Sequence, residues 1–486
     1  MNCCVEIAVG RTLQVIPPSL QNRLSQLLSL SDYERLFNIQ RRPRLLSGVG
    51  RVNGLPTPLL ELSAESQEGA TPMQAKPTLG WVLALCLMAG SLTACSHPGK
   101  TVNKSWDPKA AATYLDQREV TWMGWPGSAR DHGTFCVSCH TVVPYVLSRP
   151  ALRTVLAEQR PSDDERKILQ NVAQRVRLWN EVGPYYTDQG YGNGKLAESR
   201  GTEAVVNALI LASNDAQVGK LSDVTKMAFN NMWALQRTEG KAKGSWSWLQ
   251  FGMEPWEAKD SQYYGAALAA VAIGIAPENY RSSPDIQDKL TLLHDYLNRE
   301  SREQSMMNRV VLLWASAKLP GLIDSEQQKL IIREILDEQR ADGGWELSSH
   351  AWPEGWNMRS MVKRRLRSDW TRQSGESDGY ATGLITFVLQ EAGVSPQDAN
   401  LKRGLSWLAH NQNSEDGSWP SLSLAQRRDP SSNTGHFMKD AATAYAVLAL
   451  SESAGAASRD SVGKNHSGDG HRTESHSILT ATTQGN

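Results

Sequence analysis

The chain has 486 residues, enough for one large domain or for two to three of ordinary size. Lys and Arg number 51 and Asp and Glu also number 51, so no net charge favours binding along a nucleic acid. Six cysteines in so long a chain do not indicate a disulfide framework, and each is interpreted from its own context.

Residues 73–95, MQAKPTLGWVLALCLMAGSLTAC, have the pattern of a secretory signal: a lysine, an apolar run and then small residues. The end of this stretch, LTAC, resembles the bacterial lipoprotein box, which implies that Cys95 is lipidated and becomes the new N-terminus. A transmembrane anchor is the alternative, but a spanning helix needs about 20 apolar residues and this run is shorter. Ser96 is compatible with outer-membrane sorting. We therefore predict a lipid-anchored protein on the periplasmic side, with the outer membrane favoured over the inner.

A signal should open a chain, so residues 1–72 are expected to be a mis-called N-terminal extension, with translation starting at Met73. N-terminal sequencing of the native protein tests this, and a native peptide from 1–72 would contradict it. Residues 96–114 are interpreted as a linker. The tail, 456–486, is rich in Ser, Gly, His and charge and is predicted to be disordered.

Helical periodicity dominates from about residue 108 onward, and one unit recurs. An amphipathic helix ends in Gln, a Gly-x-Trp turn follows, and a nearly all-apolar helix comes after a loop. Three copies show the turn best: MWALQRTEGKAKGSW (232–246), EILDEQRADGGW (334–345) and RGLSWLAHNQNSEDGSW (403–419). We expect Gln to bond free carbonyls at the helix end, Gly to permit the turn, and Trp to cover the joint between units.

Two classes of helix alternate along this region. The polar helices are predicted near 164–180, 219–236, 285–300, 325–339 and 398–411, and Ser162 with Glu165 forms a capping box before the first. The apolar helices begin near Glu203, Tyr263, Asn308, Gly379 and Ala441, and their small residues favour close packing. This makes five pairs, with a candidate sixth in 108–155, and implies two concentric layers.

The Gln-to-Trp turns resemble those of the (α/α) toroid of the squalene–hopene cyclase and protein prenyltransferase superfamily. The resemblance implies an all-α, double-layered ring of five to six helix pairs over 156–455. The resemblance does not extend to the catalytic and metal-binding motifs of that superfamily. The Asp-x-Asp-Asp motif of the cyclases is absent, since SDDE at 162–165 is better interpreted as the capping box. No cysteine follows Cys139, so the prenyltransferase zinc ligands are absent, as is the Gly-Cys-Gly-Glu-Gln string of thioester toroids.

Carboxylates stand near the starts of four apolar helices, at Glu203, Asp260, Asp378 and Asp440. Helix capping accounts for them in one interpretation. In the other, they form a ring of acids around the mouth of a central cavity, with tyrosines beside them. The long loops at 346–377 and 420–438 would collect at that end, and VKRRLRS (362–368) is a basic patch suited to an acidic partner or to lipid head groups.

The segment FCVSCH contains Cys136-x-x-Cys139-His140, the pattern of covalent haem c attachment. Two thiols add to the two vinyl groups of one haem, and the histidine becomes the proximal iron ligand. A disulfide is the main alternative, and a structural zinc site would want a fourth ligand. We expect one covalent haem c in a segment spanning 115–155, with Met123 or His132 as sixth ligand.

Three functions remain open from the sequence. The first is an exported monohaem protein that exchanges electrons with an unidentified redox partner or an apolar ligand, such as an isoprenoid, at the ring cavity. The second is a cyclase-like enzyme that uses the cavity carboxylates. The third is a binding scaffold with neither haem nor catalysis.

Overall fold

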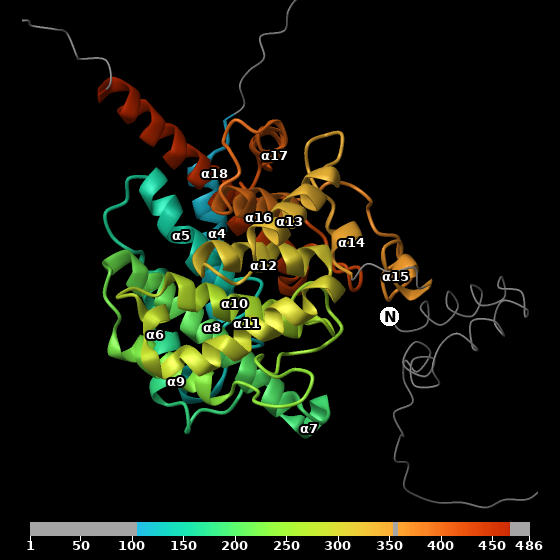
Figure 1. Cartoon of the computed structure of the whole chain (residues 1–486). Coiled ribbons are helices and arrows are strands. Elements are labelled where there is room, and N and C mark those ends of the chain that lie inside the picture. The colour runs from blue at the N-terminus through green and yellow to red at the C-terminus, as the bar shows by residue number, and fades with distance from the viewer. Residues whose placement is uncertain (1–104, 353–357, 467–486) are drawn as a thin grey trace, which may run out of the picture. The chain divides into compact units, whose positions relative to one another are not determined.

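The computed structural model describes residues 105–352 and 358–466, and within these ranges the chain is helical, with isolated β-bridges but no strand (Figure 1). The predicted signal, the lipidation residue Cys95 and the extension 1–72 lie outside the described residues. No helix in the described ranges is both long and apolar enough to cross a membrane.

Six helices form a closed inner ring, in which each helix contacts the next and the last contacts the first. In ring order they are α5 (Val142–Val155), α8 (Lys195–Val218), α10 (Ser261–Ile275), α12 (Met306–Lys318), α16 (Gly379–Glu391) and α18 (Asn433–His466). Six further helices pack on this ring from outside: α4 (Pro108–Gly124), α6 (Asp163–Arg177), α9 (Asp223–Ala234), α11 (Gln287–Glu300), α13 (Ser325–Asp337) and α17 (Ala399–His410). The predicted all-α, double-layered ring is confirmed, with six pairs.

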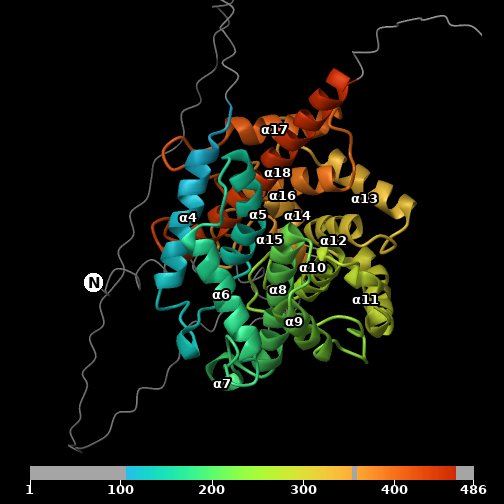
Figure 2. The same cartoon turned by 90° about the vertical axis from the view of Figure 1, so that its left-hand side faces the viewer.

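Short helices occupy some of the loops between the layers. They are α7 (Asp188–Tyr191), α14 (Leu347–His350) and α15 (Met358–Lys363), and they lie at the periphery of the ring (Figure 1; Figure 2). The loop that carries α14 and α15 meets the loop before α18, because Arg367 Nε donates to the Ser423 carbonyl at 2.6 Å. These two loops therefore form one layer at the end of the ring where the inner helices begin.

The inner helices are buried on nearly all sides because small residues let their backbones approach closely. A Cβ on Gly265 would lie 2.1 Å from the Trp248 ring, and one on Gly383 would lie 2.7 Å from the Ala446 nitrogen. A larger side chain at Gly383 would push α16 and α18 apart, and one at Gly265 would displace the Trp248 ring of the preceding loop.

The Gln-to-Trp turns link consecutive outer helices. In each turn the Gln Nε2 donates both to the Gly carbonyl of its own turn and to a carbonyl at the start of the next outer helix. The indole Nε1 of each Trp donates to a carbonyl near the end of its own outer helix, at 2.5 to 2.8 Å. The predicted roles are thus exchanged in part: Trp satisfies the free carbonyls, and Gln joins one unit to the next.

The last turn closes the ring on the first helix. Gln412 Oε1 accepts from the Asp107 amide at 2.6 Å, and Gln412 Nε2 donates to the Asp107 carbonyl at 2.9 Å. Asp107 is the N-cap of α4, so the same joint that links neighbouring units also links the two ends of the ring.

This closure corrects the predicted division of the chain. Residues 115–155 do not form a segment apart from the toroid, because they provide most of α4 and all of α5, the sixth pair. Helix α4 already begins at Pro108, inside the predicted linker 96–114, and α18 continues to His466, so 456–466 are helical. The physical reason is burial: five pairs would leave the faces of α8 and α18 uncovered, and α5 covers both.

Candidate functional site

The FCVSCH loop leads directly into α5, on the inner ring. Cys136 and Cys139 are both buried, at 7% and 4% exposure, and both thiols are free. The Trp122 indole donates to the Cys136 carbonyl at 2.8 Å, and Ser138 Oγ accepts from the Thr141 and Val142 amides at 3.2 and 3.1 Å. The disulfide interpretation therefore has no counterpart in this structure.

An aromatic cluster surrounds His140. Phe437 stacks on the imidazole at 3.6 Å between centroids, Trp122 meets it edge-on at 5.1 Å, and Trp256 lies at 5.8 Å. Desolvation by these neighbours, and then the Arg118 charge, lower the pKa of His140 to about 3. The imidazole is therefore neutral over the physiological range.

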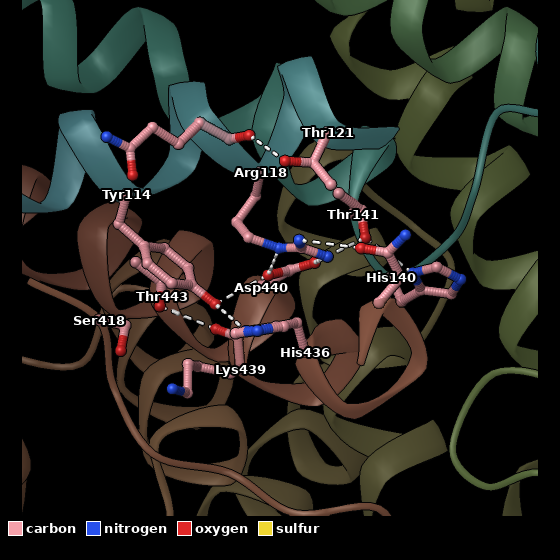
Figure 3. Close-up of polar contacts among 12 residues, drawn as sticks. Tyr114, Arg118, Thr121, His140, Thr141, Ser418, His436, Lys439, Asp440 and Thr443 are labelled. Carbon is pink, nitrogen blue, oxygen red and sulfur yellow. Dashed lines mark hydrogen bonds and ion pairs between the residues drawn. The ribbon is translucent and has the colours of Figure 1, made fainter. Parts of the chain in front are cut away.

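A hydrogen-bond chain fixes the tautomer of His140. Thr141 Oγ1 lies 2.8 Å from His140 Nδ1 and donates to Asp440 Oδ2 at 2.9 Å (Figure 3). A hydroxyl has a single proton, so Thr141 must accept from His140 while it donates to Asp440. Nδ1 therefore carries the proton and Nε2 has a free lone pair, to which no hydrogen bond is formed within the described ranges.

The far end of this chain is a buried ion pair. Arg118 bonds Asp440 through Nε at 2.9 Å and Nη2 at 3.2 Å, and the Tyr114 hydroxyl donates to the same carboxylate at 2.8 Å. Burial raises the pKa of Asp440, while the Arg118 charge and these hydrogen bonds oppose the shift. The cluster joins α4, α18 and the start of α5, as Figure 3 shows, so it also holds the ring closed.

The residues at this loop fit a covalent haem in two respects. An imidazole binds iron through the lone pair in its ring plane, so the Phe437 ring on its face leaves Nε2 available. His140 is also partly exposed, so its imidazole is not sealed by the aromatic side chains around it. The Thr141–Asp440 chain resembles the outer-sphere partners that orient metal-binding histidines.

Glu257 was missed by the sequence analysis. It precedes α10, and burial raises its pKa to about 7, against a smaller opposing effect of the Lys195 charge. The negative charge of Glu257 contributes to the raised pKa of both Cys136 and Cys139, and its side chain is partly exposed. Its carboxylate makes no hydrogen bond or ion pair with another described residue. In the sequence EPWEAKD (254–260), no feature distinguishes Glu257 from Glu254. Glu254 differs only in the structure, where it binds Trp352 and Lys363.

The four predicted cavity acids do not form one site, because each has partners of its own. Glu203 pairs with Arg175 at 2.6 Å, and Asp260 Oδ2 accepts from Asn308 at 3.2 Å. Asp440 belongs to the cluster around His140.

Asp378 is the N-cap of α16 and accepts from the Tyr380 and Ala381 amides at 2.9 and 3.1 Å. Burial raises its pKa to about 6. Of the four, Asp378 alone caps a helix through its side chain. Asp260 also stands at an N-cap position, that of α10, but its side chain bonds no amide of that helix. Glu203 and Asp440 are buried with partners of their own.

The two expected sixth ligands lie in different surroundings. The side chain of His132 is 44% exposed and lies 3.5 Å from Asp131, whereas Met123 is partly buried at the end of α4 and packs against the core. Across the described part of the chain, no group of three or more His, Cys, Asp or Glu side chains could hold a metal ion. A structural zinc site of the usual kind thus has no support there.

Comparison with known proteins finds similarity of fold among solved structures. No family model and no curated protein matches the chain. One solved structure that it resembles is the type II terpene cyclase MstE from Scytonema in its apo form, at 10% identity and a TM-score of 0.35, covering 71% of this chain and 99% of that one. At this TM-score, the similarity carries no information on the activity of this chain.

Proposed function

We propose that the protein is a c-type haem protein, in which Cys136 and Cys139 form the two thioether bonds and His140 Nε2 is the proximal iron ligand. One observation supports this above the others: the Thr141–Asp440 chain keeps the proton of the neutral His140 on Nδ1 and leaves its Nε2 lone pair free. A haem bound there would supply one-electron redox chemistry.

The surrounding residues have definable tasks in this proposal. Arg118 and Asp440 orient the imidazole through Thr141, and Trp122, Trp256 and Phe437 exclude water from it. Met123 or His132 as sixth ligand, an unidentified redox partner, and an apolar ligand in the ring interior all remain predictions. Lipid anchoring at Cys95 on the periplasmic side remains one as well.

A reduced-minus-oxidised absorption spectrum with a pyridine haemochrome assay tests the proposal, on protein made in cells equipped for c-type maturation. We expect a c-type spectrum in the natural protein and its loss in Cys136→Ala/Cys139→Ala. His140→Ala should keep covalent haem but shift the Soret band, because the proximal ligand is lost. His410→Ala is the matched control, because His410 is exposed at the end of α17 and has no role in the proposed haem site. His132→Ala should shift the spectrum only if His132 is the sixth ligand.

Absence of haem from the natural protein after maturation would overturn the proposal. A spectrum that survives in the double cysteine variant would overturn the covalent attachment.

Acid–base chemistry on an apolar substrate is a second candidate, favoured by Glu257. A carboxyl group whose pKa is about 7, with no bonding partner among the described residues and next in sequence to Trp256 of the aromatic cluster, can release or take up a proton near neutral pH. Turnover of a polyprenyl substrate that is lost in Glu257→Gln but kept in Cys136→Ala/Cys139→Ala would favour this candidate over haem chemistry. A protein with neither haem nor turnover would be a binding scaffold.

A further inference from the structure

A protruding part of the surface combines exposed apolar side chains with arginines. It is formed by the loop 361–372 and the facing segment 422–427, which meet where the Ser368 amide donates to the Ala425 carbonyl at 2.8 Å. Its apolar members are Met361, Val362, Trp370 and Leu422, exposed at 46%, 41%, 59% and 59%. Its exposed cations are Arg365, Arg372 and Arg427. We call these seven residues the basic–apolar patch.

The loop 361–372 is strongly basic. Residues 361–372, MVKRRLRSDWTR, contain five Lys or Arg and one Asp, although the whole chain is neutral. That one acid, Asp369, is engaged by the amides of Thr371 and Arg427 at 3.0 and 2.6 Å. Arg365, Arg372 and Arg427 form no ion pair with any residue in the described ranges, so their charges are available to an external anion.

The backbone holds Trp370 outward at a cost. Its φ is +63°, in the left-handed region that residues other than glycine rarely adopt. The Trp370 amide donates to the Arg367 carbonyl at 3.0 Å, and Arg367 is itself buried and bound to the Ser423 carbonyl. A large aromatic side chain is thus presented to solvent by a supported, strained turn rather than packed into the core.

From these observations we infer that the basic–apolar patch docks on an anionic lipid surface. Arginines attract acidic head groups, and Trp with Met, Val and Leu can enter the interfacial zone, where an indole is favoured. An acidic protein would satisfy the arginines, but it would leave four exposed apolar side chains without a reason. Helix α15, which carries Met361 and Val362 of the patch, lies away from α7 and α9 (Figure 1). The inference does not depend on haem.

Co-sedimentation with phospholipid vesicles tests this, on the chain from residue 96 onward, which keeps the whole described ring. Neither the apolar run of 73–95 nor acylation of Cys95 can then contribute. We expect binding to vesicles that contain phosphatidylglycerol, little binding to pure phosphatidylcholine, and release as ionic strength rises. Arg365→Gln/Arg372→Gln/Arg427→Gln should weaken the partition by at least about tenfold. Trp370→Ala should also weaken binding to the vesicles that contain phosphatidylglycerol.

Matched controls come from other exposed positions. Lys241→Gln/Lys243→Gln removes two exposed charges elsewhere, and Leu330→Ala removes an apolar side chain that is 48% exposed. Both should bind as the parent does, and circular dichroism should show all variants folded. Equal binding to neutral and anionic vesicles, or an unaffected triple variant, would overturn the inference. Capture on immobilised poly-glutamate without vesicle binding would also overturn it, in favour of an acidic protein partner.

Discussion

His140 shows how one proton decides what a side chain can do. Its ring has two nitrogens, and the hydroxyl of Thr141 decides between them because that hydroxyl must give its own proton to Asp440. If the proton were on Nε2 instead, His140 Nδ1 and Thr141 Oγ1 would face each other with lone pairs and no proton between them. The Arg118–Asp440 ion pair thus acts on His140 through a single intervening residue.

Glu257 should make stability depend on pH in a defined window. Its carboxyl keeps its proton to about pH 7 in the folded state, whereas in the unfolded chain it ionises near 4.5. Between these values the unfolded state binds fewer protons, so the free energy of unfolding falls as pH rises from about 4.5 to 7. The full loss is about 3 kcal/mol. Urea unfolding at several pH values should show that Glu257→Gln lacks this contribution.

The comparison of Glu257→Gln with the natural protein isolates this group from other buried carboxyls. The difference in free energy of unfolding should be small near pH 4.5 and favour the variant above pH 7. A difference that stays constant across this window would show that Glu257 does not titrate within it. Glu239→Gln serves as the control, because Glu239 is an exposed loop glutamate.

At the scale of the element, the Gln-to-Trp turn depends on a backbone shape that its glycine supplies. Gly244, Gly343 and Gly417 have φ of +97°, +93° and +77°. In each turn the glycine also faces the neighbouring outer helix: a Cβ on Gly244 would lie 1.9 Å from the Leu292 carbonyl oxygen of α11. The turn therefore needs glycine twice, for its φ and for the space.

Gly244→Ala should destabilise the protein more than a change of φ alone explains. The left-handed conformation costs alanine about 1–2 kcal/mol, and the clash with α11 adds about 1–3 kcal/mol. Gly240→Ala is the matched control, because Gly240 also has a positive φ, +74°, but has nothing within 4 Å of its Cβ position. Thermal and urea unfolding should separate the two variants, and equal losses would show that α11 yields to the added methyl group.

At the scale of the whole molecule, closure of the ring rests on contacts between the two ends of the described chain. Gln412 bonds Asp107 across 305 positions of sequence, and Arg118 bonds Asp440 across 322. Trp106 also lies 6.2 Å from Trp419 between ring centroids. Every inner helix consequently has two ring neighbours, and no end of the ring is left to solvent.

Gln412→Glu should open the ring at one place. The carboxylate would face the carbonyls of Asp107 and Gly417, which now accept from the amide, and we expect a loss of about 3 kcal/mol. Hydrogen exchange read by mass spectrometry should show faster exchange in the first turns of α4. Gln236→Glu makes the same change in another turn, where Gln236 bonds Lys289 of α11. In Gln236→Glu, faster exchange should appear in α11 and not in α4. If both variants increased exchange in α4, the idea that each Gln holds only its own joint would be wrong.

Periodicity was sufficient to predict ten of the helices, because a buried and an amphipathic helix differ in composition at every turn. The helix α6 begins at Asp163 behind the Ser162–Glu165 capping box, as the sequence predicts. The sixth pair stayed a candidate within 108–155, because the FCVSCH loop between α4 and α5 suggested a separate segment. The position of α4 and α5 in the ring follows only from the tertiary structure, in which α5 packs against the faces of both α8 and α18.

The sequence by itself determined the all-helical repeat, its turns and the presence of two thiols and a histidine at haem c spacing, because each of these depends on residues close together in the chain. Tertiary structure alone decided the rest. It brought Arg118, Thr141 and Asp440 together, separated the four predicted acids, and left Glu257 desolvated without a partner in the described ranges. The physical reason is that charge and protonation depend on which groups share a desolvated space, and ring closure assembles that space from opposite ends of the chain.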